Sequence, residues 1–294
     1  MPKYVCGIKI TNMEIAFITN KLQDLKKLKQ TDVLYFGDEF CQNKIPNIKQ
    51  TEHCYKFCTD NKIKFVLVLP FITNAKVCPV NRLLNFLNSK KEKTEVVFND
   101  WGTFTLVSQY KNLKPVLGRL LNKQRKDPIV QKIFENKQPK MKIVTEKGKQ
   151  VIAQAKQIPN TLIKYFQSSY LNVFEVQEFM IKNNITRYEL DLLPWNTKLN
   201  INKKIKLTVY YPYVNISATR YCGAINLNYS SKCNKICEKQ NVIIGEKSLE
   251  YPYMIIGNAI FYKATETMLE KELKSNKINR IVFNDINSLL GYKK

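Results

Sequence analysis

Continuous apolar runs recur along the chain, and each ends at glycine, proline or a short polar turn. The clearest runs are residues 32–36, 64–69, 95–98 and 280–283. Between them lie amphipathic stretches such as 80–90, in which Leu83, Leu84 and Leu87 fall on one helical face. A strand covered on both faces of a parallel sheet is apolar throughout, whereas a surface helix is apolar on one side only. The alternation therefore predicts parallel βα units.

The rest of the pattern extends this alternation. Further strands are predicted at 4–10, 15–19, 115–121, 187–192, 207–211 and within 253–262, and further helices at 21–29, 47–62, 104–110, 173–183 and 267–274. The basic segment 122–142 carries Pro128 and Pro139 and is predicted to leave the core, with a long helical region after it. These units suffice for a TIM-like (β/α)8 barrel with one long insertion, in a single domain spanning 1–294. An open doubly wound sheet is the alternative, but no G-x-G-x-x-G follows the first strand.

Composition places the chain among globular proteins. It has 294 residues, of which 44% are hydrophobic, enough for a large core. No apolar run is long enough for a bilayer and no apolar signal core occupies the N-terminus, so we expect a cytoplasmic, reducing location. The formal charge of +24 suggests RNA or another polyanion as a partner. The lysines are scattered and the chain is rich in Asn and Ile, so a compositional bias of an AT-rich genome is the alternative.

Three cysteines gather in the segment 220–237, which contains Cys222, Cys233 and Cys237. Thiolates at short spacing in a reducing compartment are typical ligands of zinc or of an iron–sulfur cluster. Cys41 follows the buried run 32–36 and would lie at the carboxyl end of its strand. It could therefore complete a set of four thiolates. Cys54 and Cys58, one turn apart beside His53, are better interpreted as core thiols than as a second metal site.

Polar residues that follow predicted strands are the candidates for catalysis, because the carboxyl ends of parallel strands meet at one rim. These candidates are Asp38, Asp100, Arg119 and Glu189. Each has a structural alternative, either capping a helix or forming an ion pair. His53 is the one histidine of the chain, and neither an H-E-x-x-H motif nor an activated serine or cysteine elbow is present.

Several of these segments together resemble a known family. They are 37–41 (Gly-Asp-Glu-Phe-Cys), 95–102 (Glu-Val-Val-Phe-Asn-Asp-Trp-Gly), 118–124 (Gly-Arg-Leu-Leu-Asn-Lys-Gln) and 220–222 (Arg-Tyr-Cys). In this order they are similar to the collagenase-like peptidase family U32, in particular its UbiV-like branch of iron–sulfur proteins of oxygen-independent ubiquinone biosynthesis. The resemblance implies a barrel-like α/β fold and a 4Fe-4S cluster on Cys41, Cys222, Cys233 and Cys237.

The same resemblance implies an activity and a partner. It points to a role in oxygen-independent hydroxylation, or a related modification reaction, with a paralogous family member in a heterodimer. The family's older description makes a collagenase-like peptidase the first alternative. An RNA-binding or RNA-modifying protein, suggested by the charge, is the second.

Overall fold

The structure of the chain is a computed structural model. It describes residues 3–5, 8–10, 13–28, 31–90, 92–126, 140–144, 148, 150–154, 159–222, 233, 235–238, 242–245 and 251–291.

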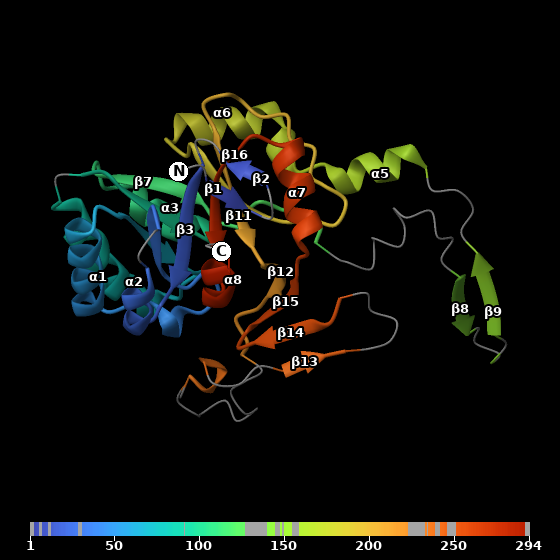
Figure 1. The fold of residues 1–294 in the computed structure, drawn as a ribbon, viewed down its shortest axis with the longest axis horizontal. Coiled ribbons are helices and arrows are strands. Elements are labelled where there is room, and N and C mark those ends of the chain that lie inside the picture. The colour runs from blue at the N-terminus through green and yellow to red at the C-terminus, as the bar shows by residue number, and fades with distance from the viewer. Residues whose placement is uncertain are drawn as a thin grey trace.

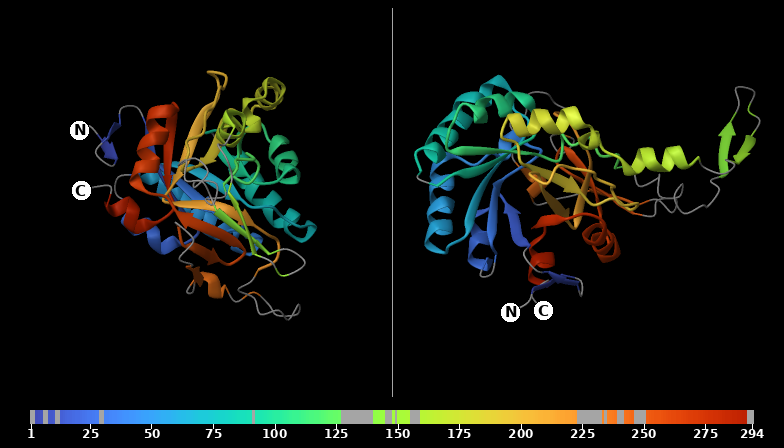
Figure 2. Two further views of the ribbon diagram at one scale, coloured as in Figure 1. Left: turned by 90° about the vertical axis from the view of Figure 1, so that its right-hand side faces the viewer. Right: turned by 90° about the horizontal axis from the view of Figure 1, so that it is seen from above.

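Eight parallel strands close into a barrel, seen in Figures 1 and 2. They are β3 (Glu14–Thr19), β4 (Val33–Gly37), β5 (Lys64–Leu69), β6 (Thr94–Phe98), β7 (Leu113–Leu117), β10 (Arg187–Asp191), β11 (Lys206–Tyr211) and β16 (Ile278–Phe283). Their order around the barrel is β10-β11-β16-β3-β4-β5-β6-β7, closed by the pairing of β7 with β10. The predicted TIM-like (β/α)8 barrel is confirmed.

Helices cover the outside of the barrel. They are α1 (Ile48–Asp60), α2 (Val77–Asn88), α3 (Trp101–Ser108), α6 (Phe174–Lys182), α7 (Glu266–Ser275) and α8 (Ile286–Gly291). A further helix, α5 (Asn160–Gln167), extends away from the barrel in Figures 1 and 2. Asn47 starts α1 with a capping box, in which its side chain accepts from Gln50 N–H and the Gln50 side chain accepts from Asn47 N–H. The barrel is irregular: the helix expected at 21–29 is a short 3₁₀ turn, Leu22–Lys27, and no helix occurs in 192–205 between β10 and β11.

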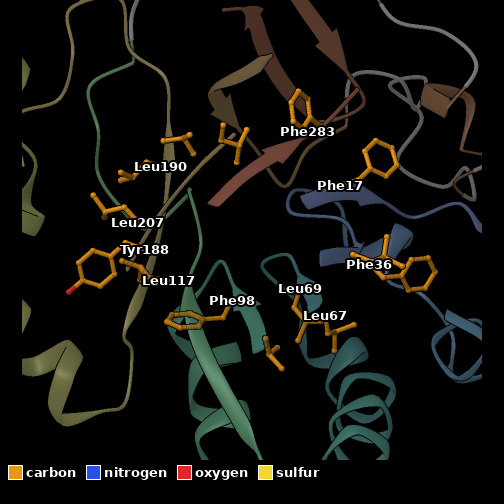
Figure 3. Packing of buried hydrophobic residues seen from close by; sticks show 14 of the residues in the cluster. Phe17, Phe36, Leu67, Leu69, Phe98, Leu117, Tyr188, Leu190, Leu207 and Phe283 are labelled. Carbon is orange, nitrogen blue, oxygen red and sulfur yellow. The ribbon is translucent and has the colours of Figure 1, made fainter. Parts of the chain in front are cut away.

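The strand alternation divides the core into two layers. Inside the barrel lie small and β-branched residues with two tyrosines, Tyr35 and Tyr210. Outside it, between strands and helices, lie larger side chains such as Phe36, Leu67 and Phe98 (Figure 3). Successive residues of a strand point to opposite faces, so Tyr35 enters the barrel while Phe36 packs against the helices.

A four-stranded antiparallel sheet lies between β11 and β16 in sequence. Its order is β12 (Tyr213–Ala218), β15 (Ala259–Lys263), β14 (Tyr253–Ile256) and β13 (Val242–Ile244). The stretch 253–262 is therefore two strands joined at Gly257, whose φ of +63° suits glycine. Phe40, just after β4, packs edge-on against Phe261 at 5.2 Å between ring centroids, which attaches this sheet to the carboxyl end of the barrel.

Two short hairpins were not expected. β1 (Lys3–Val5) and β2 (Ile8–Ile10) pair where one strand is predicted. β8 (Lys140–Val144) and β9 (Gln150–Gln154) form a hairpin that projects from the barrel in Figures 1 and 2. The prediction of a long helical region after residue 142 is therefore wrong for the strand residues up to 154. Its residues include the β-branched Ile143, Val144, Val151 and Ile152, and Gly148, at φ +70°, lies in the connection.

Candidate functional site

Arg119 is the centre of a buried ion network at the carboxyl end of the barrel. It follows β7 and is 1% exposed. Its Nε and Nη2 donate to both carboxylate oxygens of Glu39, at 2.9 and 2.6 Å, and its Nη1 donates to Asp191 Oδ1 at 2.6 Å. The guanidinium also lies 3.9 Å from the ring centroid of Tyr210. A bidentate pair with a second carboxylate and a stacked ring fixes Arg119 in place.

Burial and ion pairing have opposite effects on the pKa values of the acidic residues in this network. Burial raises the pKa of Asp191, but the charges of Arg119 and Lys126 outweigh it and hold that pKa below its usual value. Lys126 donates to Asp191 and to the Arg119 carbonyl. Burial raises the pKa of Glu39, only partly opposed by Arg119. Arg119 therefore links the carboxyl ends of β4, β7 and β10.

A second polar network fills the amino end of the barrel. Arg280 donates to Glu95 Oε2 at 2.6 Å and lies 2.6 Å from Glu14 Oε2, and Arg187 donates to Glu95 Oε1 at 3.2 Å. Arg280 also donates to the Tyr35 hydroxyl at 2.7 Å.

The candidate Glu189 lies inside the barrel, further along β10 than Arg187. Its Oε1 accepts from the Tyr35 hydroxyl at 3.0 Å. Burial raises the pKa of Glu189 to about 8, against the opposing charges of Arg280 and Arg187. Its Oε2 and the Tyr210 hydroxyl are buried and have no hydrogen-bond partner among the described residues. Glu189 therefore holds a proton at neutral pH.

The candidates Asp38 and Asp100 both bind backbone N–H groups. Asp100 caps α3, where its Oδ1 accepts from Thr103 N–H at 2.7 Å. Asp38 Oδ1 accepts from the N–H groups of Phe40 and Cys41 at 2.9 and 2.8 Å. Asp38 thus fixes the turn that carries Cys41.

Asn258 joins the two segments that carry cysteines. Its side-chain amide donates to the Phe40 carbonyl at 2.7 Å and to the Thr219 carbonyl at 2.6 Å. Phe40 precedes Cys41, and Thr219 lies three residues before Cys222. The turn that holds Asn258 therefore fixes these two parts of the chain next to each other.

The neighbouring residue, Gly257, lies against a third cysteine. A Cβ placed on Gly257 would be 3.3 Å from Cys237 Sγ, in tight contact. The glycine therefore leaves room for this sulfur. A single turn, from β14 to β15, borders the segments of Cys41, Cys222 and Cys237.

Burial dominates the pKa values of these cysteines. Burial raises the pKa of Cys41 to about 11, and Asp38 and Cys233 add to the rise. Burial raises the pKa of Cys237, and Cys222 and Cys233 add to it, while Lys44 opposes. None of the four is in a disulfide. The turn at Gly257 and Asn258 thus brings together the turn of Cys41, Thr219 just before Cys222, and Cys237. Within the described ranges, no three His, Cys, Asp or Glu side chains converge closely enough to hold one metal ion.

The donor set suits a cluster better than a single ion. Four thiols are soft ligands, and in a 4Fe-4S cluster each thiolate binds a different iron, so the sulfur atoms need not meet at one point. The two cysteines of α1 differ. Cys54 and Cys58 are 0% and 1% exposed within the core, and burial raises the pKa of each to about 12. His53 beside them is exposed. Their interpretation as core thiols fits this environment.

A cavity of about 330 Å³ opens between the barrel and the antiparallel sheet. Phe40, Tyr213, Ile256 and Phe261 contribute apolar surface, and Lys44, Asn258 and Asp285 contribute polar groups. This size is within the range of small-molecule sites. Phe40, Lys44 and Asn258 also belong to the surroundings of the cysteines, so the cavity adjoins them.

Sequence reasoning missed Lys44, Gly257, Asn258 and Lys126. The Gly-Asn pair at 257–258 is a recognisable turn signal, and it could have divided 253–262 into two strands. Nothing in the pattern marks Lys126, because its partner Asp191 is far away in the sequence, and nothing distinguishes Lys44 from the many other lysines.

Fold and site together define a (β/α)8-type barrel protein with a group of cysteines beside a cavity at its carboxyl end. No family profile matches the sequence, and no curated protein matches it. Within the described residues, no helix has the length and apolarity needed to cross a membrane.

Two solved structures are similar in fold. The U32 peptidase Mk0906 is 10% identical, with 97% of this chain and 96% of that chain covered and a TM-score of 0.43. A glycoside hydrolase family 18 N-acetylglucosaminidase from Paenibacillus barengoltzii is 8% identical, with 96% and 100% covered and a TM-score of 0.33. At these scores neither similarity assigns the chain to a family, and the U32 family stays a prediction from the motifs.

Proposed function

We propose that this chain is a UbiV-like member of the U32 peptidase-like family that binds a 4Fe-4S cluster through Cys41, Cys222, Cys233 and Cys237. It takes part in an oxygen-independent hydroxylation, or a related modification reaction, together with a paralogous partner protein. The observation that carries the proposal is that one turn, at Gly257 and Asn258, contacts Phe40 beside Cys41, Thr219 just before Cys222, and Cys237 itself.

The surroundings of the thiols support this assignment. Burial raises the pKa of Cys41 and Cys237, so the free thiols are protonated at neutral pH. Binding of cationic iron compensates the cost of burying their thiolates. Four thiolates leave no iron position open, so a bound cluster supplies electron transfer or a structural centre and does not bind substrate at iron.

The cavity gives the substrate a place. Phe40 and Lys44 line it and lie within three residues of Cys41. A molecule bound in the cavity would therefore contact residues that adjoin Cys41 in the sequence. The chain's own residues then bind and orient the substrate.

The peptidase alternative lacks a comparable feature. Asp38 and Asp100 are engaged by backbone N–H groups, and Arg119 is paired with Glu39 and Asp191. Among the predicted catalytic residues, Glu189 has a buried oxygen with no hydrogen-bond partner within the described part of the chain, and this oxygen is enclosed in the barrel.

Metal analysis tests the proposal. Protein purified and reconstituted without oxygen should contain about four irons and four sulfides per chain and give an EPR signal when reduced. Cys41→Ser and Cys237→Ser should each lose the cluster. Cys78→Ser, which changes an exposed cysteine of α2, should keep it. An iron-free wild type after reconstitution would reject the cluster.

A further inference from the structure

The amino end of the barrel carries a layer of charged residues. Seven of the eight strands place one there at an inward-facing position, because each lies an even number of residues before a residue inside the barrel. Five of the seven are basic and two are acidic, which leaves an excess of three positive charges. They are Glu14, Lys64, Glu95, Lys114, Arg187, Lys206 and Arg280.

The two carboxylates of this layer are ionised. Burial raises the pKa of Glu14, but Arg280 and Lys64 outweigh it and lower that pKa to about 2. Burial also opposes ionisation of Glu95, and the charges of Arg280 and Arg187 hold its pKa below the usual value. Arg280 donates to both carboxylates, and Lys64 donates to Glu14. Two carboxylates therefore serve the two arginines and Lys64, and none is left for the other lysines.

The excess positive charge lies on three neighbouring strands. β7, β10 and β11 are consecutive around the barrel, and they carry Lys114, Arg187 and Lys206. Arg187 and Lys206 are partners in the parallel register of β10 and β11. Like charges opposite each other on one face of a sheet destabilise the pairing. Among the described residues, Lys114 and Lys206 form no ion pair with a carboxylate.

All seven charged residues line one cavity of about 260 Å³. Lys93 and Glu92 line it too, and their charges cancel. Arg187 is 4% exposed, and its Nη2 lies 3.6 Å from Glu14 Oε2, too far for a hydrogen bond. Arg187 therefore keeps N–H groups with which to bind a ligand. A buried guanidinium beside two unpaired lysines suits the oxygens of a phosphate group.

We propose that this cavity binds a diphosphate group, held by Lys114, Arg187 and Lys206. A multivalent anion there would compensate the excess charge and relieve the repulsion between Arg187 and Lys206. The group could belong to free pyrophosphate or to a nucleoside diphosphate. The cavity is at the opposite end of the barrel from Cys41, so this inference goes beyond the proposed function and does not depend on a cluster.

The test is equilibrium dialysis with radiolabelled pyrophosphate and, separately, ADP at physiological salt. Wild type should bind a single pyrophosphate per chain. The double variant Lys114→Gln/Lys206→Gln should bind it about tenfold or more weakly, because two charge-assisted contacts are lost. Both lysines are exposed, so the variant should keep the far-UV circular dichroism of wild type. Lys49→Gln/Lys271→Gln, which removes two exposed lysines outside the cavity, should keep wild-type affinity.

The ADP arm identifies the source of the diphosphate. Tighter binding of ADP than of pyrophosphate supports a nucleotide ligand, and weaker binding supports the free anion. Wild type that binds neither overturns the proposal. Equal weakening in the two double variants also overturns it, because the attraction then belongs to the net charge of the whole chain.

RNA is the competing ligand. An RNA oligonucleotide that binds through Lys114 and Lys206, with no binding of pyrophosphate or ADP, overturns the diphosphate site and assigns these lysines to nucleic acid. The dialysis needs no iron in the protein. Its failure therefore leaves the proposed function standing, and an iron-free wild type leaves this inference standing.

Discussion

At the residue scale, the chain places several charges where water cannot reach them, and each is stabilised by a specific partner. Arg119 is the clearest case, because its donors are met by Glu39, Asp191 and the Tyr213 carbonyl. The pairing compensates the desolvation of all three ionised groups. A buried network of this kind fixes the relative positions of the strands that carry it.

Removing Arg119 should destabilise the barrel strongly. Arg119→Met leaves Glu39 and Asp191 buried without their cation, and we expect a loss of about 3–5 kcal/mol in the free energy of unfolding. Arg119→Lys should retain part of this, since it keeps the charge and loses the bidentate geometry. Urea denaturation measures the effect, with the exposed Arg82→Met of α2 as control. Equal stability of Arg119→Met and the control would contradict the structural role.

Glu189 gives a pH dependence whose sign is fixed by its raised pKa. The folded protein holds this proton up to a pKa of about 8, whereas the unfolded chain releases it near the ordinary value of 4.5. Its contribution to stability is therefore fully present below pH 4.5 and is lost as the pH rises toward 8.

Glu189→Gln, which imitates the protonated acid, should remove this dependence. Relative to wild type its free energy of unfolding should rise by roughly 4 kcal/mol between pH 4.5 and 8. Denaturation at pH 5, 6.5 and 8 measures it, with the exposed Glu178→Gln as control. Parallel pH profiles for Glu189→Gln and wild type would show that Glu189 is ionised in the fold.

At the scale of elements, the β14–β15 turn positions the cysteine segments. Gly257 has a φ of +63°, and a Cβ added to it would lie 3.3 Å from Cys237 Sγ, while Asn258 donates to the carbonyls of Phe40 and Thr219. The turn thus combines a backbone conformation that favours glycine with two hydrogen bonds to distant segments. It arranges the cysteines without contributing a ligand.

Gly257→Ala should therefore lower cluster content. The added methyl group is strained at this φ and meets Cys237 Sγ at 3.3 Å. We expect fewer irons per chain after anaerobic reconstitution, with the far-UV circular dichroism of the barrel unchanged. Gly245→Ala is the matched control, since a Cβ there meets no atom within 4 Å. Full iron content in Gly257→Ala would show that the turn does not position Cys237.

The elements also show what sequence can and cannot predict. The runs 64–69 and 280–283 were recognisable as strands because residues buried on both faces must be apolar without interruption. The β8–β9 hairpin was missed because short apolar runs fit helix and strand equally well.

Contacts between distant residues left still less trace in the sequence. The cysteines were recognisable as a group by residue type, and Cys41 by its place after a strand. The contacts of Asn258 and Arg119 depend on residues up to 218 positions away, which local periodicity does not encode.

At the scale of the whole molecule, the barrel, the antiparallel sheet and the projecting hairpin have different structural roles. The barrel carries the core, and the sheet packs against Phe40 at the barrel's carboxyl end. β8 and β9 pair only with each other among the described strands. Residues 127–158, which include this hairpin, contain seven lysines and three acidic residues.

Replacing residues 127–158 with a short Gly-Ser linker should therefore leave the barrel and cluster intact. We expect an unchanged unfolding midpoint and iron content, because the described strands of this segment pair with none in the barrel. If the segment supplies phosphate contacts, RNA retention should fall, and the wild type's affinity should decrease steeply with salt. Retention that barely changes with salt would reject RNA binding through phosphates. Loss of iron on replacement would mean that residues 127–158 support the cysteine site and are not independent of it.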